Sequence, residues 1–154
     1  MGLDMYLNAK RFISGYDKET KELKVSGLKG VASPKEGAFN EMGRVNQIIV
    51  NGIYWRKANA IHKWFVDNVQ EGKDDCEPYP VDRNDLEKLK ELCKKIMADK
   101  EKASEILPVH EGFFFGGYEY DDWYFDGIRQ TIYEIELLLE TFGDSWDFYY
   151  QSSW

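Results

Sequence analysis

The first group of residues that could do chemistry lies about a third of the way along the chain. Arg56, Asn59 and Lys63 are three and seven residues apart, so on a helix they would share one face. Cations and an amide near a helix N-terminus can bind an anionic group. His62 could act there as an acid or base near neutral pH, and Trp55 adds a ring beside the cations. The cluster predicts a site for a small anionic, nucleotide-like ligand; a solvated helix face with one boundary histidine is the alternative.

The C-terminal stretch offers a second polar group among aromatic residues. Tyr149, Gln151 and Ser153 combine a ring, an amide and a hydroxyl, which together can recognise the edge of a small molecule. The same alternation is typical of an edge strand that ends a sheet. We expect these three residues to contribute to the same ligand-binding site. On this hypothesis, the C-terminal rings and the face that starts at Arg56 surround one shared hollow.

Acidic and cysteine residues give weaker indications of metal binding or catalysis. A group of carboxylates could bind a hard cation or supply an acid/base pair, although acids also favour the first turn of a helix; they are Glu119, Asp121, Asp122 and Asp126. Asp74, Asp75 and Cys76 have no zinc-site spacing to either histidine. Phosphate-loop, dinucleotide, nucleophile-elbow and zinc-protease motifs are absent from the sequence. We expect no metal, no cofactor and no catalytic residue. His62 with an acid from 119–126 is the only pair that an enzyme hypothesis could use.

Charge is distributed unevenly along the chain. Residues 111–154 contain ten acidic residues and one basic residue, whereas residues 1–110 contain 18 and 19. The same C-terminal segment holds 15 of the 24 aromatic residues. Direct nucleic-acid binding is disfavoured, because phosphate contacts need clustered Lys and Arg. The acidic segment also suggests a second function, an inhibitor that mimics nucleic acid and blocks a basic site on a host protein.

Hydrophobic periodicity predicts the elements that must position these residues. Alternation predicts strands over 3–12 and 45–54, with a bulge or bend at Gly52, and another strand in the tail. The expected helices are about 55–70, a segment starting after Asp82, a short piece at 100–107, and about 121–142. The fold class is therefore α+β, with about three helices on a small, mainly antiparallel sheet. We expect a single domain over 1–154, with a mobile loop or hairpin at 13–43.

Four strings of the sequence together resemble a family of small proteins of bacteriophages and bacteria whose members are generally hypothetical proteins: MGLDMYL, YWRKANAIHKWFV, GFFFG and WDFYYQSSW. The resemblance implies a phage or mobile-element setting and a role in counter-defence. It carries no established activity.

No apolar run approaches the ~20 residues of a membrane-spanning helix, and the two cysteines form no disulfide framework. We expect a protein of the host-cell cytoplasm with no membrane contact, and a binding protein in preference to an enzyme. Its expected partners are a small anionic ligand or a host protein, and self-association is compatible with the sequence.

Overall fold

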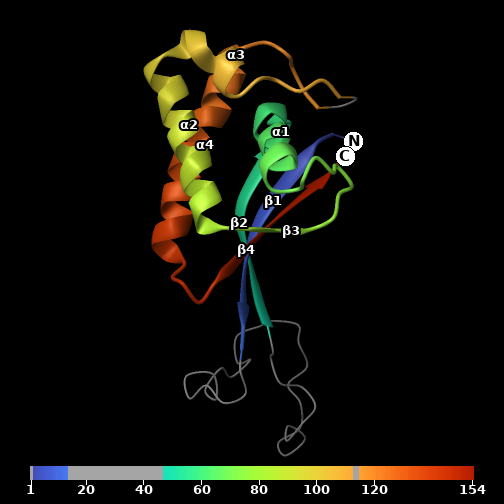
Figure 1. Cartoon of the computed structure of the whole chain (residues 1–154), viewed down its shortest axis with the longest axis vertical. Coiled ribbons are helices and arrows are strands. Elements are labelled where there is room, and N and C mark those ends of the chain that lie inside the picture. The colour runs from blue at the N-terminus through green and yellow to red at the C-terminus, as the bar shows by residue number, and fades with distance from the viewer. Residues whose placement is uncertain (1, 14–46, 113–114) are drawn as a thin grey trace, which may run out of the picture.

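The computed structural model describes residues 2–13, 47–112 and 115–154, which form one antiparallel sheet and a set of helices (Figure 1). The strand order is β2-β1-β4-β3. The strands are β1 (Asp4–Phe12), β2 (Gln47–Arg56), β3 (Tyr79–Val81) and β4 (Asp147–Ser153). The helices are α1 (Asn59–Asn68), α2 (Arg83–Ala98), the 3-10 turn η2 (Lys100–Lys102), α3 (Ala103–Ile106) and α4 (Asp122–Thr141). The predicted α+β class is confirmed.

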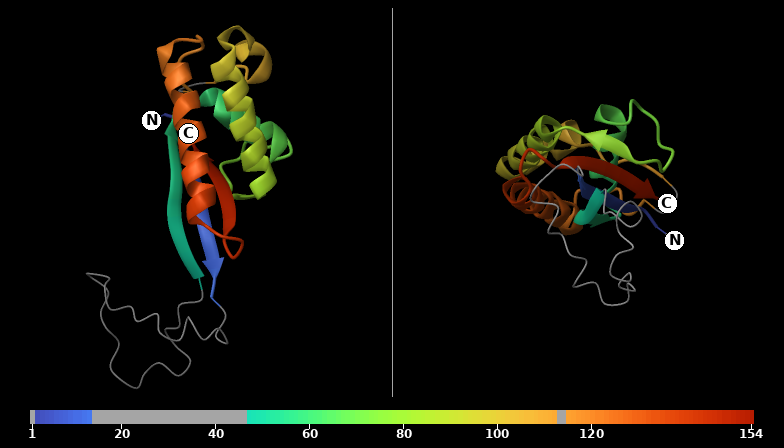
Figure 2. Two further views of the ribbon diagram at one scale, coloured as in Figure 1. Left: turned by 90° about the vertical axis from the view of Figure 1, so that its left-hand side faces the viewer. Right: turned by 90° about the horizontal axis from the view of Figure 1, so that it is seen from below.

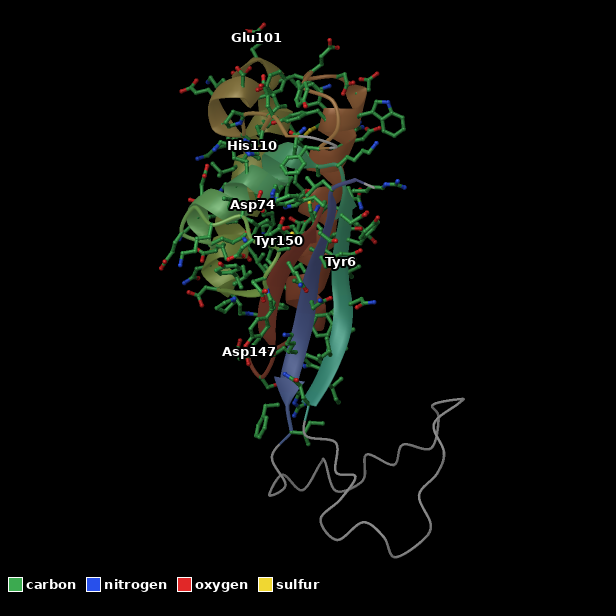
Figure 3. The ribbon with its side chains drawn as sticks, turned by 90° about the vertical axis from the view of Figure 1, so that its right-hand side faces the viewer. Tyr6, Asp74, Glu101, His110, Asp147 and Tyr150 are labelled. Atoms are coloured by element: carbon green, nitrogen blue, oxygen red, sulfur yellow. The ribbon has the colours of Figure 1, made fainter. Side chains whose placement is uncertain are left out.

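Among the described residues, the helices cover one face of the sheet. Along β1, Met5, Leu7 and Ala9 are fully buried, whereas Tyr6 between them is 38% exposed. A strand places alternate side chains on opposite faces, so this pattern marks a covered face and an outer face. Figure 2 shows α4 running lengthwise along the strands. In Figure 3, Tyr150 lies on the helix side of the sheet and Tyr6 on the outer side.

A bulge at Gly52 allows α4 to approach β2 closely. Leu7 pairs with Ile53 and the next residue of β1 pairs with Asn51, so Gly52 has no partner in the register. A Cβ atom at Gly52 would lie 2.6 Å from the carbonyl oxygen of Leu7 and 2.5 Å from Leu138 Cδ1 on α4. Only glycine fits this position without a shift of its neighbours. The bulge predicted at Gly52 is confirmed.

Strand β4 lies inside the sheet. It pairs with β1 along its whole length and with β3 over residues 148–150. The tail was predicted as a strand, and this prediction is confirmed. Its interpretation as an edge strand is wrong for 148–150, because the three-residue strand β3 pairs with these residues. Pro80 fits there, since β3 is an edge strand that can lack an N–H donor.

The first helix begins later than the sequence predicted. Residues 55 and 56 belong to β2, and α1 starts only at Asn59. Between them, Lys57 adopts a left-handed backbone conformation with φ of 56°. Its N–H donates to the carbonyl oxygen of Leu3 (2.8 Å), which extends the pairing with the N-terminal strand. A helical face shared by Arg56, Asn59 and Lys63 is therefore wrong, since Arg56 is not on the helix.

Helices α2 and α4 pack together through apolar side chains. The buried positions of α2 are Leu86, Leu89, Cys93 and Ile96. Arg83 joins the two helices, because its guanidinium donates to the carbonyl oxygens of Leu139 (3.2 Å) and Phe142 (2.9 Å) at the end of α4. A cation is favourable at the negative C-terminal end of a helix, so Arg83 stabilises the end of α4.

The two predicted helix caps have different outcomes. Asp121 caps α4, because its carboxylate accepts the Tyr124 N–H at 3.1 Å. Asp82 precedes α2 without forming a side-chain capping bond. The short helical piece before Pro108 is confirmed as η2 and α3.

In the GFFFG string, Phe115 is a buried loop residue, while residues 113–114 lie outside the described structure. Most of the segment predicted as a mobile loop at 13–43 also lies outside it.

Candidate functional site

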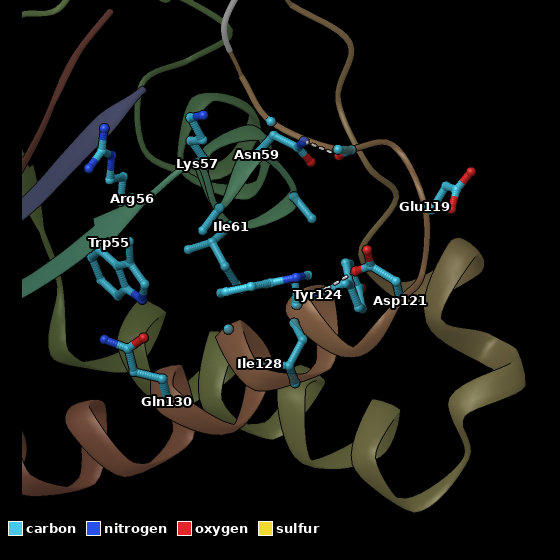
Figure 4. Close-up of a pocket in the computed structure, with 16 residues that line it drawn as sticks. Trp55, Arg56, Lys57, Asn59, Ile61, Glu119, Asp121, Tyr124, Ile128 and Gln130 are labelled. Carbon is cyan, nitrogen blue, oxygen red and sulfur yellow. Dashed lines mark hydrogen bonds between the residues drawn. The ribbon is translucent and has the colours of Figure 1, made fainter. Parts of the chain in front are cut away.

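The structure contains a cleft of about 580 Å³ between the end of β2 and the start of α4 (Figure 4). Its walls come from β2, the first turn of α1, the loop before α4, and the first two turns of α4. The polar and aromatic lining residues are Trp55, Arg56, Lys57, Asn59, Glu119, Asp121, Trp123, Tyr124 and Gln130. A volume of this size falls within the ~300–1,000 Å³ typical of small-molecule sites.

Two cations form one side of the cleft. Arg56 is the last residue of β2, and Lys57 follows it in the left-handed turn, so both residues lie at the rim of the cleft. Both residues are exposed, and neither forms an ion pair with any residue that the structure describes. A non-glycine residue with positive φ costs about 1 kcal/mol or more and is common at binding sites. This side of the cleft is therefore available to an anion.

Asn59 holds the loop that forms another wall of the cleft. The Asn59 side chain is buried, and its amide nitrogen donates to the carbonyl oxygens of Gly117 (2.9 Å) and Phe115 (3.4 Å). Its amide oxygen accepts the backbone N–H of His110 at 3.2 Å. All the polar atoms of this side chain are thus used inside the protein. Asn59 lines the cleft, but it acts as a positioning residue for His110, Phe115 and Gly117.

Gly116 brings this loop against the turn at Lys57. Its φ is 107°, and a Cβ atom there would lie 3.0 Å from both Lys57 Cβ and the Lys57 carbonyl oxygen. A side chain is therefore disfavoured by both the conformation and the space. The contact fixes the width of the cleft where the two loops meet.

The side opposite the cations carries two carboxylates and an exposed ring. In Figure 4, Glu119 and Asp121 lie across the cleft from Arg56 and Lys57. Trp123 also lines the cleft, and it is 84% exposed. A tryptophan left in water without a partner is unusual, because burying a large ring is favourable. The cleft therefore combines positive charge, negative charge and an available aromatic surface.

Trp55 forms part of the cleft but is not free to stack on a ligand. It is 2% exposed, and its indole N–H donates to Thr131 Oγ1 on α4 at 2.9 Å. Tyr124 is similarly fixed, because its hydroxyl donates to the Leu107 carbonyl oxygen at 2.8 Å. Burial raises the pKa of this hydroxyl, so it stays protonated. Trp123 is the ring with the most surface left for a ligand.

His62 does not face the cleft. It is fully buried, with Nδ1 2.8 Å from the Tyr150 hydroxyl and Nε2 3.1 Å from Asp74 Oδ2. The other oxygen of Asp74 accepts the indole N–H of Trp154 at 3.1 Å. Burial lowers the pKa of His62, against the opposing effect of the hydrogen bond to Asp74. This network joins α1, β4 and the loop between α1 and β3.

The remaining predicted ligand residues also lie elsewhere. Lys63 on α1 is paired with Asp67 at 2.7 Å. Tyr149 and Gln151 are on the outer face of the sheet; the Lys10 ammonium lies 4.0 Å from the Tyr149 ring centre, and the Gln151 amide donates to the Cys76 carbonyl oxygen at 2.9 Å.

Ser153 pairs with Asp4 at the end of β4 and does not line the cleft. Of the residues predicted for one hollow, only Trp55, Arg56 and Asn59 line it, and the C-terminal rings beside them are Trp123 and Tyr124.

Sequence reasoning missed Lys57 as a site residue, and it treated Glu119 and Asp121 as possible metal ligands, as an acid/base pair or as acids of a first helical turn. The acidic type of the two carboxylates was visible in the sequence, but their position relative to Arg56 and Lys57 was not. Within the described ranges no group of three or more His, Cys, Asp or Glu residues is arranged to hold a metal ion.

None of the helices in the described part of the chain is long and apolar enough to cross a membrane. No protein-family model matches the chain, and no curated protein or solved structure matches it significantly. Arguments about function therefore rest on the cleft itself.

Proposed function

We propose that this chain is a non-enzymatic binding protein that takes a small anionic, nucleotide-like ligand in the cleft. One observation carries the proposal: a single hollow is lined both by the cations Arg56 and Lys57, which have no ion-pair partner in the described part of the chain, and by the exposed ring of Trp123. A phosphate can bind the cations while a base stacks on the indole. Stacking of a base on an aromatic side chain contributes about 1–3 kcal/mol.

A binding role is favoured over catalysis by the chemistry of the lining. The described residues around the cleft include no histidine, cysteine or serine, so the common pair of a serine or cysteine nucleophile with a histidine base is not found among them. His62, the base that the enzyme hypothesis required, is enclosed between Tyr150 and Asp74 instead. A host protein is the other partner that the sequence left open; the concave form of the cleft favours a small ligand.

The sequence resemblance implies a phage-type setting, and the proposed binding would have a biological role in that setting. A protein that sequesters a nucleotide-derived signal inside the host cell would act in counter-defence without performing chemistry. This role needs only tight binding in the cytoplasm, and the cleft supplies the groups for it.

Binding can be tested with inorganic phosphate and a panel of ribonucleoside mono-, di- and triphosphates. Thermal unfolding should shift upward for a bound nucleotide, because a ligand at 100 times its Kd stabilises the folded state by about 2.7 kcal/mol. Replacing Arg56 and Lys57 together by Gln should weaken binding at least tenfold in calorimetry. The matched control is Lys63→Gln, a cation outside the cleft, which should bind as the unchanged protein does.

The ring is tested separately with Trp123→Ala, which should lose about tenfold or more in affinity with little change in stability, because the indole is mostly exposed. Tyr133→Ala removes another exposed ring of α4 that does not line the cleft, and it serves as the control. Absence of a thermal shift with every nucleotide would end the proposal. So would equal affinities of the Arg56/Lys57 variant and the Lys63 control.

A further inference from the structure

The two edges of the sheet, β3 and β2, differ in how well they are protected against pairing with another chain. Strand β3 has only three residues and contains Pro80, and both features block an edge. Strand β2 has ten residues, and from Gln47 to Trp55 it contains no charged residue and no proline. Its backbone pairs with β1 alone among the described residues. One row of N–H and C=O groups along β2 is therefore open.

The bulge at Gly52 does not close this edge. It interrupts the register with β1 only between Asn51 and Ile53. On either side of it, residues 47–51 and 53–56 pair regularly with β1. Both segments therefore keep the extended form that a further strand needs.

Exposed apolar side chains flank the open edge on both faces of the sheet. On the outer face, Ile49 is exposed and lies opposite Lys10 of β1. On the helix side, α4 runs along β2 (Figure 2) and carries the exposed Leu137. Trp123, Gln130 and Leu137 are seven residues apart, so they share one stripe of the helix. The first two line the cleft with the end of β2, which places this stripe on the β2 side of α4.

We propose that two copies of this chain pair through β2, antiparallel and about a two-fold axis, so that their sheets join into one. A strand that pairs with itself in this way offers the same row of donors and acceptors from both sides. Its one charged residue, Arg56, goes to opposite ends of the pair, about 30 Å apart at the ~3.4 Å rise per residue of a strand. Like charges therefore do not meet across the axis.

A second copy fits this surface better than an unrelated extended peptide does. A peptide added to β2 would satisfy the open backbone groups but would leave the α4 stripe in water. A second copy brings its own α4 and its own outer face to the same junction. Leu137 and Ile49 of both copies then lose exposed apolar surface together with the pairing of the strands, which is favourable.

Sedimentation velocity of the full chain at increasing concentration measures the association directly. We expect one step from 18.1 kDa to twice that mass, because a two-fold interface closes on itself. A chain that stays at 18.1 kDa at every concentration would overturn the inference. A continuous series of larger species would also overturn it, since open-ended pairing is not a closed dimer.

The decisive variant is Ile49→Lys, which adds a charge beside the open edge, as natural edge strands do to block pairing. The dissociation constant of the dimer should rise about tenfold or more, while the fold is kept because Ile49 is exposed. The matched control is Asn8→Lys, which adds the same charge on the outer face of the inner strand β1. It should leave the dissociation constant unchanged. Equal effects of the two variants would refute pairing at the β2 edge.

The helix side of the junction is tested with Leu137→Ala, which should weaken the dimer several-fold because exposed apolar surface is removed from the α4 stripe. Tyr133→Ala removes another exposed apolar side chain of α4 that is off this stripe, and it should have no effect. A dimer that responds to Tyr133→Ala and not to Leu137→Ala would place the interface on another side of the helix.

Hydrogen exchange resolved by residue identifies the surface that is used. In an antiparallel strand, N–H groups point alternately to the two sides, so every second amide of β2 faces the open edge. These amides should exchange at least tenfold more slowly as the dimer forms, whereas the amides bonded to β1 should change little. A dimer that leaves the outward amides of β2 unprotected would overturn the inference.

Discussion

We expect the side-chain amide of Asn59 to hold in place the loop that forms one wall of the cleft. In Asn59→Ala, the 2.9 Å and 3.2 Å hydrogen bonds to Gly117 and His110 disappear, and so does the longer contact with Phe115. Two good bonds contribute about 1 kcal/mol each, and the longer one less. We expect the free energy of unfolding to fall by about 2 kcal/mol, which in a chain of this size lowers Tm by about 4–8 °C.

Urea unfolding measures the global loss, and hydrogen exchange measures the local one. The backbone amide of His110 should exchange at least tenfold faster, because its acceptor is gone. Asn68→Ala is the matched control: Asn68 also lies on α1 and donates only to the Trp64 carbonyl oxygen at 2.8 Å. It is exposed, so its replacement should cost about 0.5 kcal/mol or less. If Asn59→Ala were as mild as this control, the loop would not be held by the Asn59 amide.

The isosteric change Asn59→Asp sharpens the same argument. The carboxylate keeps an acceptor for the His110 N–H, but it turns a donor into a charge facing two carbonyl oxygens. At pH 7 this variant should be less stable than Asn59→Ala, since a buried charge is left without a partner. The folded state would raise the pKa of this carboxyl, so the deficit should shrink as the pH falls toward the ordinary Asp value of about 3.9. An aspartate variant more stable than the alanine variant at pH 7 would refute the assigned geometry.

Three further predictions concern the parts of the fold that support the cleft. Gly52→Ala should lower the free energy of unfolding by about 1–3 kcal/mol in urea titrations, because its Cβ meets the Leu7 carbonyl group; Gly127→Ala, where a Cβ meets open space on α4, should raise it by about 0.5–1 kcal/mol. Burial lowers the pKa of His62 in the folded state. Below the ordinary histidine pKa of about 6.5, the unfolded state therefore binds more protons than the folded state does. Stability should therefore fall as the pH drops from 6.5 toward the folded pKa, and His62→Gln should flatten this part of the profile; an unchanged profile would contradict it. Burial raises the pKa of the Cys93 thiol to about 12, so a thiol reagent should label Cys76 in the folded protein and reach Cys93 only on unfolding; equal labelling rates would show that Cys93 is accessible.

The strands could be predicted because one-sided burial leaves a clear alternation. In β1 and β4 buried residues alternate with more exposed ones, and most of the buried ones are apolar or aromatic, as in Met5, Leu7, Phe148 and Tyr150. The end of β2 could not be predicted in this way. Trp55 and the apolar residues after it also fit a helical stripe, so periodicity alone extended the helix backward to residue 55. The actual boundary is set by the turn at residue 57, where a lysine occupies a conformation usually associated with glycine.

The sequence predicted some residue types of the cleft, but it did not predict which of these residues come together in space. Arg56 and Asn59 were identified as candidates because cations and amides suit an anion. Glu119 was noticed as an acid, yet more than sixty residues separate it from Arg56 in the chain. Their meeting depends on how α4 crosses the sheet, which periodicity does not specify. His62 could not be told apart from a site histidine, because its partners Asp74 and Tyr150 come from two other segments.

The position of β4 in the middle of the sheet governs when this protein can fold. Strand β1 leaves the ribosome before the other described strands, with Met5, Leu7 and Ala9 ready to be covered, but one of its two neighbours is synthesised more than 130 residues later. Until β4 inserts between β1 and β3, an edge of β1 stays open to pairing with other chains. Contacts this distant in sequence form slowly. The nascent chain therefore carries an unfinished sheet until β4 has been synthesised, and at that stage it is most exposed to aggregation and most dependent on chaperones.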